Sequence, residues 1–216
     1  MTNRIAIIAG ATGLVGGGLL AGLLADPGVA AVHSIGRKAL PMQHPKLTGH
    51  VVDFAALPAL PPADEVYLAL GTTIKVAGSQ EAFRAVDFDA NLAVAKAALA
   101  AGAKRVGLVS AMGADSRSSV FYSRVKGELE DALAQLPFEG LVIARPSMLV
   151  GNRDALGQPT RRGEIWATQV SEVLGFLIPA NYKPIAADAV AKALLTDVPM
   201  AHGKKVLLSG AMQLGA

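Results

Sequence analysis

A glycine-rich turn near the start of the chain constrains the fold more than any other feature. The apolar run at 4–9 has the composition of a strand that is buried on both faces, and an apolar helical pattern begins at Leu14. Between them lie Gly10, Gly13 and Gly16. Strand, glycine turn and helix in this order are typical of a phosphate-binding turn in a parallel α/β fold.

The three glycines are spaced G-x-x-G-x-x-G, which differs from the commoner G-x-G-x-x-G. In such a turn Gly10 forms the tight bend, Gly13 lets the backbone approach a pyrophosphate, and Gly16 lets helix and strand pack closely. The alternative is a helix-entry loop that binds nothing. We favour a dinucleotide site, because the flanking strand and helix supply the context that such a site requires. Gly17 and Gly18 have no functional explanation from the sequence.

Strand and helix patterns alternate along the chain, which predicts an α/β fold: a doubly wound parallel sheet of about seven strands with helices on both faces. The expected strands are 4–9, 31–35, 48–52, 65–70, 105–109, 140–145 and 205–209. The expected helices are 14–25, 80–101, 120–136, 164–177 and 187–196. Prolines predict irregular structure in 37–47 and 55–62. We predict one domain, 1–216, in which 147–184 forms a small C-terminal substrate cap.

The turn after the second expected strand bears on which dinucleotide binds. Proteins that select NAD usually place Asp or Glu there, whereas those that select NADP place Arg. Here the turn reads Gly36-Arg37-Lys38 and offers no carboxylate. Arg and Lys together match a dianionic phosphate in charge, and the Arg fork binds it in two places. Two basic residues on a turn are also commonly just solvated, but this position favours NADP as the cofactor.

Tyr122 and Lys126 form the candidate catalytic pair. They lie four residues apart in the expected helix 120–136, so their side chains share one helix face. An ammonium beside a phenol stabilises the phenolate, which makes the phenol a proton donor and acceptor for a carbonyl/alcohol couple. A half-buried Tyr near a solvated Lys is the commoner meaning of Y-x-x-x-K. Its place after the fifth expected strand of a nucleotide-binding fold favours the catalytic interpretation.

Taken together, the motifs resemble those of the short-chain dehydrogenases/reductases, and more narrowly the atypical subgroup that contains the Tat-interacting oxidoreductase and its bacterial relatives. The resemblance covers most of the chain. Its markers are Gly-Ala-Thr-Gly-Leu-Val-Gly at 10–16, Leu-Gly-Thr-Thr at 70–73, Val-Asp-Phe-Asp at 86–89, Val-Ser-Ala-Met-Gly-Ala-Asp at 109–115, residues 122–128, and Arg-Pro-Ser at 145–147. Several motifs in the right order are more specific than any one of them.

The resemblance implies a Rossmann-type fold, bound NADP, and a catalytic acid/base at Tyr122. It also implies that Lys126 assists Tyr122 and holds the nicotinamide ribose. The residues that it places at the cofactor are Gly10, Thr12, Gly13, Leu14, Val15 and Gly16 in the first turn, Arg37 and Lys38, Asp53 and Phe54 beside the adenine, Gly71, Thr72 and Thr73 along the cofactor, and Pro146 and Ser147 near the nicotinamide.

The chain departs from the family pattern at two places. The hydroxyl that steadies the substrate carbonyl is supplied after the fifth strand, and here only Ser110 offers one, because Ala111 and Met112 follow. Classical members also place an Asn on the fourth helix, where it holds a water of a proton relay. The nearest candidates here are Asp87 and Asn91. Asp87 aligns with that position, and a capping or structural role for it is an equal alternative.

Composition limits the remaining function classes. A net charge of +3 with scattered basic residues argues against nucleic-acid binding. No apolar stretch reaches the ~18 residues that span a bilayer, so we expect no membrane partner. The four histidines show no metal-ligand spacing, and we expect no metal. The lack of cysteine, together with a first strand that leaves no room for a signal peptide, predicts a cytoplasmic protein. A homodimer is left open.

Two functions of different class follow from these motifs. The first is an NADP-dependent reductase that acts on a small carbonyl compound through Tyr122, Lys126 and Ser110. The second is a non-catalytic NADP-binding module that senses redox state or holds a protein partner. The Tyr-Lys pair favours the enzyme. Candidate substrate-pocket residues in the expected cap are Arg153, Arg161, Arg162, Trp166, Tyr182 and Lys183, which are equally compatible with a solvated rim.

Overall fold

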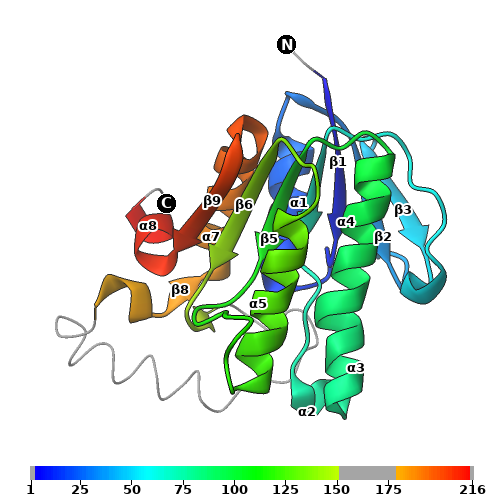
Figure 1. Ribbon diagram of the computed structural model, residues 1–216. Helices are drawn as coiled ribbons and strands as arrows, with labels where there is room; N and C mark the ends of the chain where they lie inside the picture. The colour runs from blue at the N-terminus through cyan, green and yellow to red at the C-terminus, as the bar shows by residue number, and fades with distance from the viewer. Residues whose placement is uncertain (1–2, 151–178, 215–216) are drawn as a thin grey trace.

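The computed structural model describes residues 3–150 and 179–214. Its main sheet has seven parallel strands in the order β3-β2-β1-β4-β5-β6-β9 (Figure 1). The strands are β1 (Arg4–Ala9), β2 (Val29–Gly36), β3 (Leu47–Val51), β4 (Glu65–Leu68), β5 (Arg105–Val109), β6 (Gly140–Arg145) and β9 (Gly203–Leu208). The chain leaves β1 towards β2 and β3, then returns to the other side of β1 with β4. This reversal confirms the doubly wound α/β fold.

Helices cover both faces of the sheet, as Figure 1 shows. One face packs against α1 (Leu14–Ala25) and α7 (Ala187–Asp197). The other packs against α4 (Asn91–Ala100) and α5 (Phe121–Ala134). Each face forms its own apolar core, because strands buried on both sides carry apolar residues in both directions, as at Ala6, Ile7, Ile8 and Ala9. No helix of the described residues is long and apolar enough to cross a membrane.

Glycines in α1 explain how closely this helix packs on α7. A Cβ on Gly18 would lie 3.0 Å from the Cβ of Ala191, and one on Gly22 would collide with Leu195. Both glycines therefore allow the two helices to approach each other. Gly17 faces elsewhere, and a Cβ there would meet nothing nearer than 3.8 Å. The structure thus gives Gly18 a packing role and leaves room at Gly17.

Most predicted elements are confirmed, but the predicted helix 80–101 is not a uniform α-helix. It consists of α3 (Gln80–Arg84), a π-helical turn η2 (Ala85–Ala90) and α4. Such turns widen a helix and redirect its side chains, and they are frequent at functional sites. Prolines keep 37–46 without a helix, as predicted, and leave a single 3-10 turn, η1 (Phe54–Ala56), in the other irregular segment.

Some short elements carry too weak a pattern to be predicted. They are α2 (Ile74–Ala77), the parallel pair β7 (Leu149–Val150) and β8 (Ile185–Ala186), the 3-10 turns η4 (Ala180–Tyr182) and η5 (Val198–Met200), and α8 (Ser209–Leu214). The predicted helix 164–177 lies outside the described residues. Val120 is the N-cap of α5, and Ser118 Oγ accepts from the Val120 N–H just before the helix begins.

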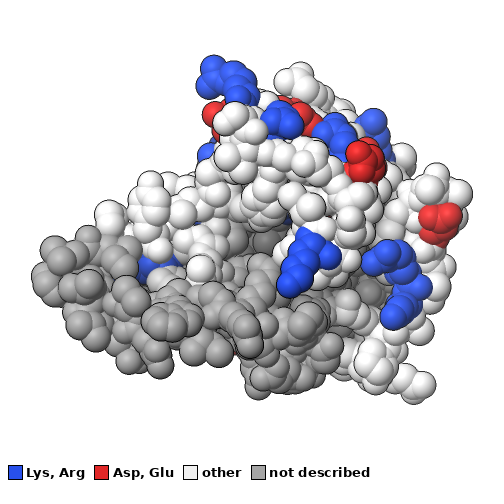
Figure 2. All heavy atoms as spheres, turned by 90° about the horizontal axis from the view of Figure 1, so that it is seen from below, with Lys and Arg blue, Asp and Glu red and all other residues white. Residues whose placement is uncertain are grey.

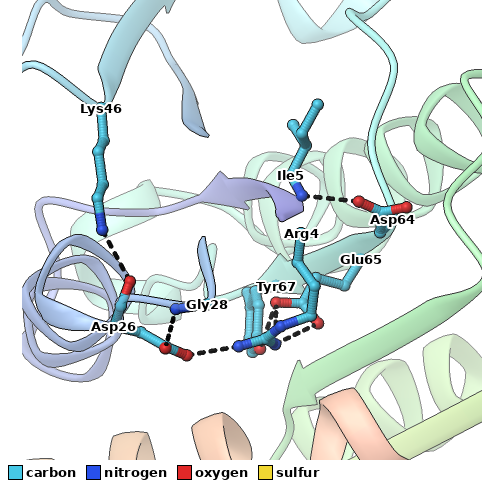
Figure 3. Close-up of polar contacts among 8 residues, drawn as sticks. All are labelled: Arg4, Ile5, Asp26, Gly28, Lys46, Asp64, Glu65 and Tyr67. Carbon is cyan, nitrogen blue, oxygen red and sulfur yellow. Dashed lines mark hydrogen bonds and ion pairs between the residues drawn. The ribbon is translucent and has the colours of Figure 1, made fainter. Parts of the chain in front are cut away.

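A partly buried charge cluster lies at the amino ends of β1 and β4 (Figure 3). The Arg4 guanidinium lies between Asp26 and Glu65, and it donates to both Glu65 oxygens at 2.9 and 3.0 Å. The Tyr67 hydroxyl donates to Glu65 at 3.2 Å. Burial raises the pKa of Glu65 despite the neighbouring guanidinium. This cluster ties β1 to β4 and to the end of α1.

Candidate functional site

The carboxyl ends of the strands form the edge where a doubly wound sheet binds its ligands. Figure 2 views the molecule from this side, and a hollow lies near the middle of the face. Lys and Arg side chains lie beside the hollow, whereas the Asp and Glu side chains visible in this view lie farther out. An anionic ligand is therefore favoured here over a cationic one.

The glycine turn is built so that backbone, and not side chain, surrounds the end of β1. Gly10 has φ +93°, and a Cβ there would collide with the backbone of Ala69. A Cβ on Gly16 would collide with the carbonyl of Gly10. Gly13 is the N-cap of α1, and its N–H donates to the Gly10 carbonyl at 3.0 Å. The turn leaves the first N–H groups of a twelve-residue helix facing the strand ends.

A second loop, 69–73, follows β4 beside the glycine turn and is held by the π-turn η2 and by the first residue of α4. Asp87 Oδ2 accepts from the Thr72 N–H at 2.8 Å. Asn91 Nδ2 donates to the Leu70 carbonyl at 3.1 Å. Thr73 caps α2 by accepting from the Val76 N–H. Of the residues expected along the cofactor, Gly71 and Thr72 therefore lie between the glycine turn and two fully buried polar side chains.

Helix α5 brings Lys126 to the same loop. Its Nζ lies 2.8 Å from Asp87 Oδ1, and both side chains are almost completely buried. The approach is that of an ion pair and not of a well-directed hydrogen bond, because Asp87 Oδ1 has no hydrogen-bond partner among the described residues. A Cβ on Gly71 would lie 3.5 Å from Asp87 Oδ1 and 3.8 Å from Lys126 Nζ. The ion pair therefore lies directly against the loop.

Tyr122 lies one turn before Lys126 on the same face of α5. It is half-buried, and its ring packs on Phe83 with centroids 5.5 Å apart. Its hydroxyl makes no hydrogen bond within the described part of the chain. Arg84 and Glu128 form an ion pair that links α3 to α5 nearby. The structure thus places the predicted Tyr-Lys pair at one corner of the strand-end site.

Ser110 belongs to a different set of contacts. It is buried just after β5, and its hydroxyl donates to Glu130 Oε1. Glu130 also accepts from Arg145 Nε at 3.0 Å and Nη2 at 2.6 Å. These hydrogen bonds raise the pKa of Arg145, although burial alone would lower it. The Ser110 proton is directed towards Glu130, which lies about two turns of α5 beyond Tyr122. Its predicted role at the substrate carbonyl stays a prediction.

The basic turn after β2 is exposed, as the NADP interpretation requires. Arg37 and Lys38 both face solvent and make no ion pair with any described residue. Asp53 is also exposed and caps η1 by accepting from the Ala55 N–H at 2.9 Å. Phe54 packs its half-buried ring against the core under α4. Neither Asp53 nor Phe54 contacts the glycine turn among the described residues, and their predicted place beside the adenine stays a prediction.

The last predicted cofactor residues, Pro146 and Ser147, follow β6. Pro146 is buried, and its carbonyl accepts from the Met112 N–H at 2.8 Å. The Ser147 N–H donates to Ser209 Oγ at 2.8 Å, and the Ser147 hydroxyl donates to the Lys183 carbonyl. Ser147 therefore connects the segment that enters the expected cap with Lys183, near the end of the cap, and with Ser209 at the start of α8. Of the candidate pocket residues, Tyr182 is exposed and Lys183 half-buried.

The remaining candidate pocket residues, Arg153, Arg161, Arg162 and Trp166, lie outside the described residues. Among all the residues that the structure describes, no group of three or more acidic or histidine side chains could hold a metal ion. The contact that sequence reasoning did not establish is the one between Asp87 and Lys126. Glu130 was missed altogether, although its spacing of four residues from Lys126 on the stripe of α5 was a signal that could have found it.

The residues present fit a dinucleotide. The turn at Gly10 and Gly16 has no space for a Cβ, the N-terminus of α1 favours a pyrophosphate, and an exposed basic pair follows β2. On the other side of β1, the ammonium of Lys126 lies against the loop after β4, and the Tyr122 ring lies one helical turn away on Phe83. The arrangement suits binding of an elongated dianionic ligand and proton transfer at its far end.

Comparison with known proteins gives close relatives in fungi. The protein named "fmp52, mitochondrial" of Emericella nidulans is 35% identical to this chain, and the match covers 96% of this chain and 95% of the relative. The protein of the same name in Aspergillus fumigatus is 34% identical over 96% and 95% of the two chains. That of Aspergillus clavatus is 41% identical over 70% and 68%. No protein-family model matches the chain.

Solved structures share the fold at low sequence identity. MoeE5 bound to UDP-glucuronic acid and NAD superposes with a TM-score of 0.70 at 18% identity, over 95% of this chain and 76% of that one. WbmH of Bordetella bronchiseptica bound to NAD+ gives 0.70 and 18%, over 98% and 78%. ADP-L-glycero-D-manno-heptose-6-epimerase of Helicobacter pylori gives 0.68 and 14%, over 95% and 77%. These matches confirm the Rossmann-type fold.

The relatives correct one prediction from the sequence. A cytoplasmic location was expected from the lack of cysteine and from the position of the first strand. The fungal relatives that match almost the whole chain are named mitochondrial proteins, so that expectation is wrong. The lack of cysteine fails as a guide because several compartments keep thiols reduced, and a chain without cysteine is compatible with all of them.

Proposed function

We propose an oxidoreductase function for this chain, which belongs to the Fmp52 family. It binds NADP across the carboxyl ends of β2, β1 and β4 and transfers a hydride to or from a small carbonyl or alcohol substrate. The observation that carries this proposal is the position of Lys126. Its buried ammonium lies against the loop after β4, one helical turn from a tyrosine hydroxyl that has no partner among the described residues.

The preference for NADP over NAD rests on the turn after β2. Structural neighbours such as WbmH were solved with NAD+, so the preference has to come from this chain's own residues and not from the fold. In this chain Arg37 and Lys38 follow β2, are exposed and offer two positive charges with no carboxylate between them. A carboxylate at this position would hold the ribose hydroxyls of NAD and repel a ribose phosphate. The basic pair attracts that phosphate.

The proposed chemistry assigns a proton to Tyr122 and a charge to Lys126. A bound reduced nicotinamide supplies the hydride that a carbonyl carbon receives. The Tyr122 hydroxyl gives its proton to the carbonyl oxygen, so that an alcohol forms and a phenolate remains until solvent returns the proton. The Lys126 ammonium stabilises that phenolate through its positive charge. In the reverse direction the phenolate removes the alcohol proton, and the same two residues suffice.

A panel of carbonyl compounds tests this assignment. The purified protein with NADPH is mixed with aldehydes, ketones and quinones, and the loss of absorbance at the nicotinamide band is followed for the unmodified chain and for Tyr122→Phe. The proposal expects turnover with at least one member of the panel and a loss of about a hundredfold or more in Tyr122→Phe, because general acid catalysis contributes 10²–10⁴-fold. Turnover that survives Tyr122→Phe would exclude Tyr122 as the acid. Tyr67→Phe is the control, since the Tyr67 hydroxyl donates to Glu65 in the cluster at the amino ends of the strands, away from the glycine turn.

One observation favours a second candidate function. The only hydroxyl at the end of β5, that of Ser110, donates its proton to Glu130 and not towards Tyr122. A substrate carbonyl would then lack the additional donor that the family supplies. This favours a non-catalytic NADP-binding module that reports redox state or holds a protein partner. Tight NADPH binding with no turnover across the whole panel, for the unmodified chain, would establish this second function in place of the first.

The narrower assignments rest on the same motifs. We propose membership of the atypical subgroup that contains the Tat-interacting oxidoreductase, on the strength of the sequence from 109 to 128. We also propose a small carbonyl compound as the substrate partner, because only 147–184 is available to enclose it. Ser110 then acts on the substrate only if its hydroxyl turns away from Glu130. Kinetics of Ser110→Ala test that role: unchanged turnover would exclude it.

A further inference from the structure

Asp87 is a buried carboxylate on an unusual piece of backbone. It is 0% exposed and lies in the π-turn between α3 and α4. A buried charge is unfavourable unless it is paired and hydrogen-bonded. One oxygen of Asp87 satisfies the Thr72 N–H, and the other lies 2.8 Å from Lys126 Nζ. The carboxylate therefore connects the loop after β4 with the catalytic helix.

The geometry of this contact leaves N–H donors of the Lys126 ammonium available to another acceptor. A lysine ammonium has three N–H donors. Asp87 Oδ1 approaches Nζ closely but off the direction of a hydrogen bond, so it balances the charge without using these donors fully. Lysine has a long flexible stem, and without a charge partner its ammonium would turn towards water. With Asp87 present, the ammonium is held at Gly71.

The position of this pair in the sheet predicts which part of a dinucleotide it affects. Arg37 and Lys38 follow β2, whereas the Asp87–Lys126 pair lies against the loop after β4 and on the helix that follows β5. Neighbouring strands lie about 4.8 Å apart, so β2 and β4 are separated by about 10 Å across β1. An adenylate held at Arg37 does not extend to Lys126. Only the second nucleoside of a dinucleotide does.

We propose that Asp87 is the positioning residue for Lys126: it holds the ammonium against the Gly71 loop so that the N–H donors meet the nicotinamide half of a bound dinucleotide. This inference deepens the proposed function and rests on it. Asp87 touches neither the dinucleotide nor the substrate and acts through Lys126. It replaces a flexible, solvated lysine by a fixed one, which lowers the entropic cost of binding the nicotinamide half.

Asp87→Asn tests the proposal, because asparagine keeps the shape and can still accept from the Thr72 N–H while the negative charge is lost. Asp89→Asn is the matched control: it lies on the same π-turn, and its side chain is exposed. Dissociation constants are measured by fluorescence and calorimetry for NADPH and for adenosine 2′,5′-bisphosphate, which lacks the nicotinamide half. Urea unfolding of each variant shows that the fold is retained.

The expected result is a split between the two ligands. Asp87→Asn weakens NADPH about tenfold and changes the affinity for the bisphosphate less than twofold, since one lost charge-assisted contact corresponds to about this factor. Asp89→Asn changes neither affinity. Equal weakening of both ligands would show that Asp87 only maintains the loop, and unchanged NADPH affinity would also overturn the proposal.

Failure of the proposed function would look different. In that case the unmodified protein binds neither ligand, and no variant is needed to show it. Should Asp87→Asn fold poorly, Lys126→Met in the Asp87→Asn background removes both charges and restores a neutral interior. That double variant is expected to fold and to bind the bisphosphate as the unmodified chain does, while it binds NADPH about tenfold or more weakly than the unmodified chain. NADPH affinity equal to that of the unmodified chain would overturn the proposal.

Discussion

Gly16 lies directly against the carbonyl of Gly10: a Cβ at Gly16 would come within 2.7 Å of the Gly10 carbonyl carbon. Gly10 in turn has positive φ and lies against the backbone of Ala69. The end of β1, the start of α1 and the loop after β4 are therefore in backbone contact at Gly10, Gly16 and Ala69. This contact shapes the surface on which we place the pyrophosphate.

Alanine at Gly16 and alanine at Gly17 are expected to act in opposite directions. Gly16→Ala forces the Gly10 carbonyl to move, so both the free energy of unfolding and the NADPH affinity should fall. Gly17→Ala meets nothing nearer than 3.8 Å and should stabilise the protein by up to about 1 kcal/mol through helix propensity. Urea unfolding and NADPH titration of the two variants check this. A stable Gly16→Ala variant with unchanged affinity would contradict the account of the turn.

Removal of the basic pair after β2 should reduce selectivity more than stability. Arg37→Ala/Lys38→Ala is expected to weaken NADPH by about tenfold or more and NADH very little, because charge-assisted hydrogen bonds to a phosphate contribute about 1.5–3 kcal/mol together. Lys204→Ala/Lys205→Ala removes two adjacent lysines from β9 at one edge of the sheet and serves as the control. If the two double variants weakened NADPH equally, general charge and not position would explain the preference.

Lys126→Met should destabilise the protein far more than Tyr122→Phe. Methionine leaves Asp87 as an unpaired buried charge, which costs about 3–5 kcal/mol, whereas phenylalanine at 122 keeps the packing on Phe83. Adding Asp87→Asn to Lys126→Met should recover part of the loss, because the interior is then neutral. Chemical unfolding of the unmodified chain, Lys126→Met, Asp87→Asn and the double variant gives the coupling free energy between the two side chains. An additive result would show that the two side chains do not act as a pair.

Tyr67 should make the fold sensitive to alkaline pH. Burial, followed by the charge of Glu65, raises the pKa of Tyr67 well above its usual value of 10.0. Above pH 10 the unfolded chain ionises this tyrosine and the folded chain does not, so stability falls as pH rises. The free energy of unfolding should therefore fall between pH 10 and pH 11.

The variant Tyr67→Phe should lose less stability than the unmodified chain over that interval. At neutral pH it is expected to be about 1 kcal/mol less stable, since the hydrogen bond to Glu65 is gone. Tyr182→Phe is the control, because Tyr182 is exposed. Urea unfolding at pH 8, 10 and 11 gives the three curves. Parallel pH profiles for the unmodified chain and Tyr67→Phe would contradict this assignment.

Local patterns were sufficient to predict the sheet and its helices. The continuous apolar runs at β1 and β6 and the glycines behind β1 have few alternative folds, and the prolines in 37–47 correctly excluded a crossover helix. The π-turn was not predictable, because its residues have ordinary helix propensity and the extra residue is accommodated only through contacts with the loop after β4. Strand ends differed by two residues at β2, where the pairing with β1 begins at Val29.

The sequence predicted which residues belong to the candidate site, but it did not predict the contacts that these residues make. Spacing placed Tyr122 and Lys126 on one helix face, and that is what the structure shows. Spacing could not show that Asp87, 39 positions earlier, pairs with Lys126, since the contact depends on how α5 packs against the π-turn. Likewise Ser110 was chosen as the one hydroxyl after β5. Its bond to Glu130 follows from tertiary packing, which no local pattern contains.

Titration of the unmodified protein with NADPH and NADH, followed by nicotinamide fluorescence, tests the central claim most directly. The account predicts saturable binding of both nucleotides at one site, with NADPH bound at least tenfold more tightly than NADH because of the basic turn after β2. Equal affinities would contradict the assignment of Arg37 and Lys38. Absence of binding for both nucleotides would contradict the proposal that this strand-end surface is a dinucleotide site.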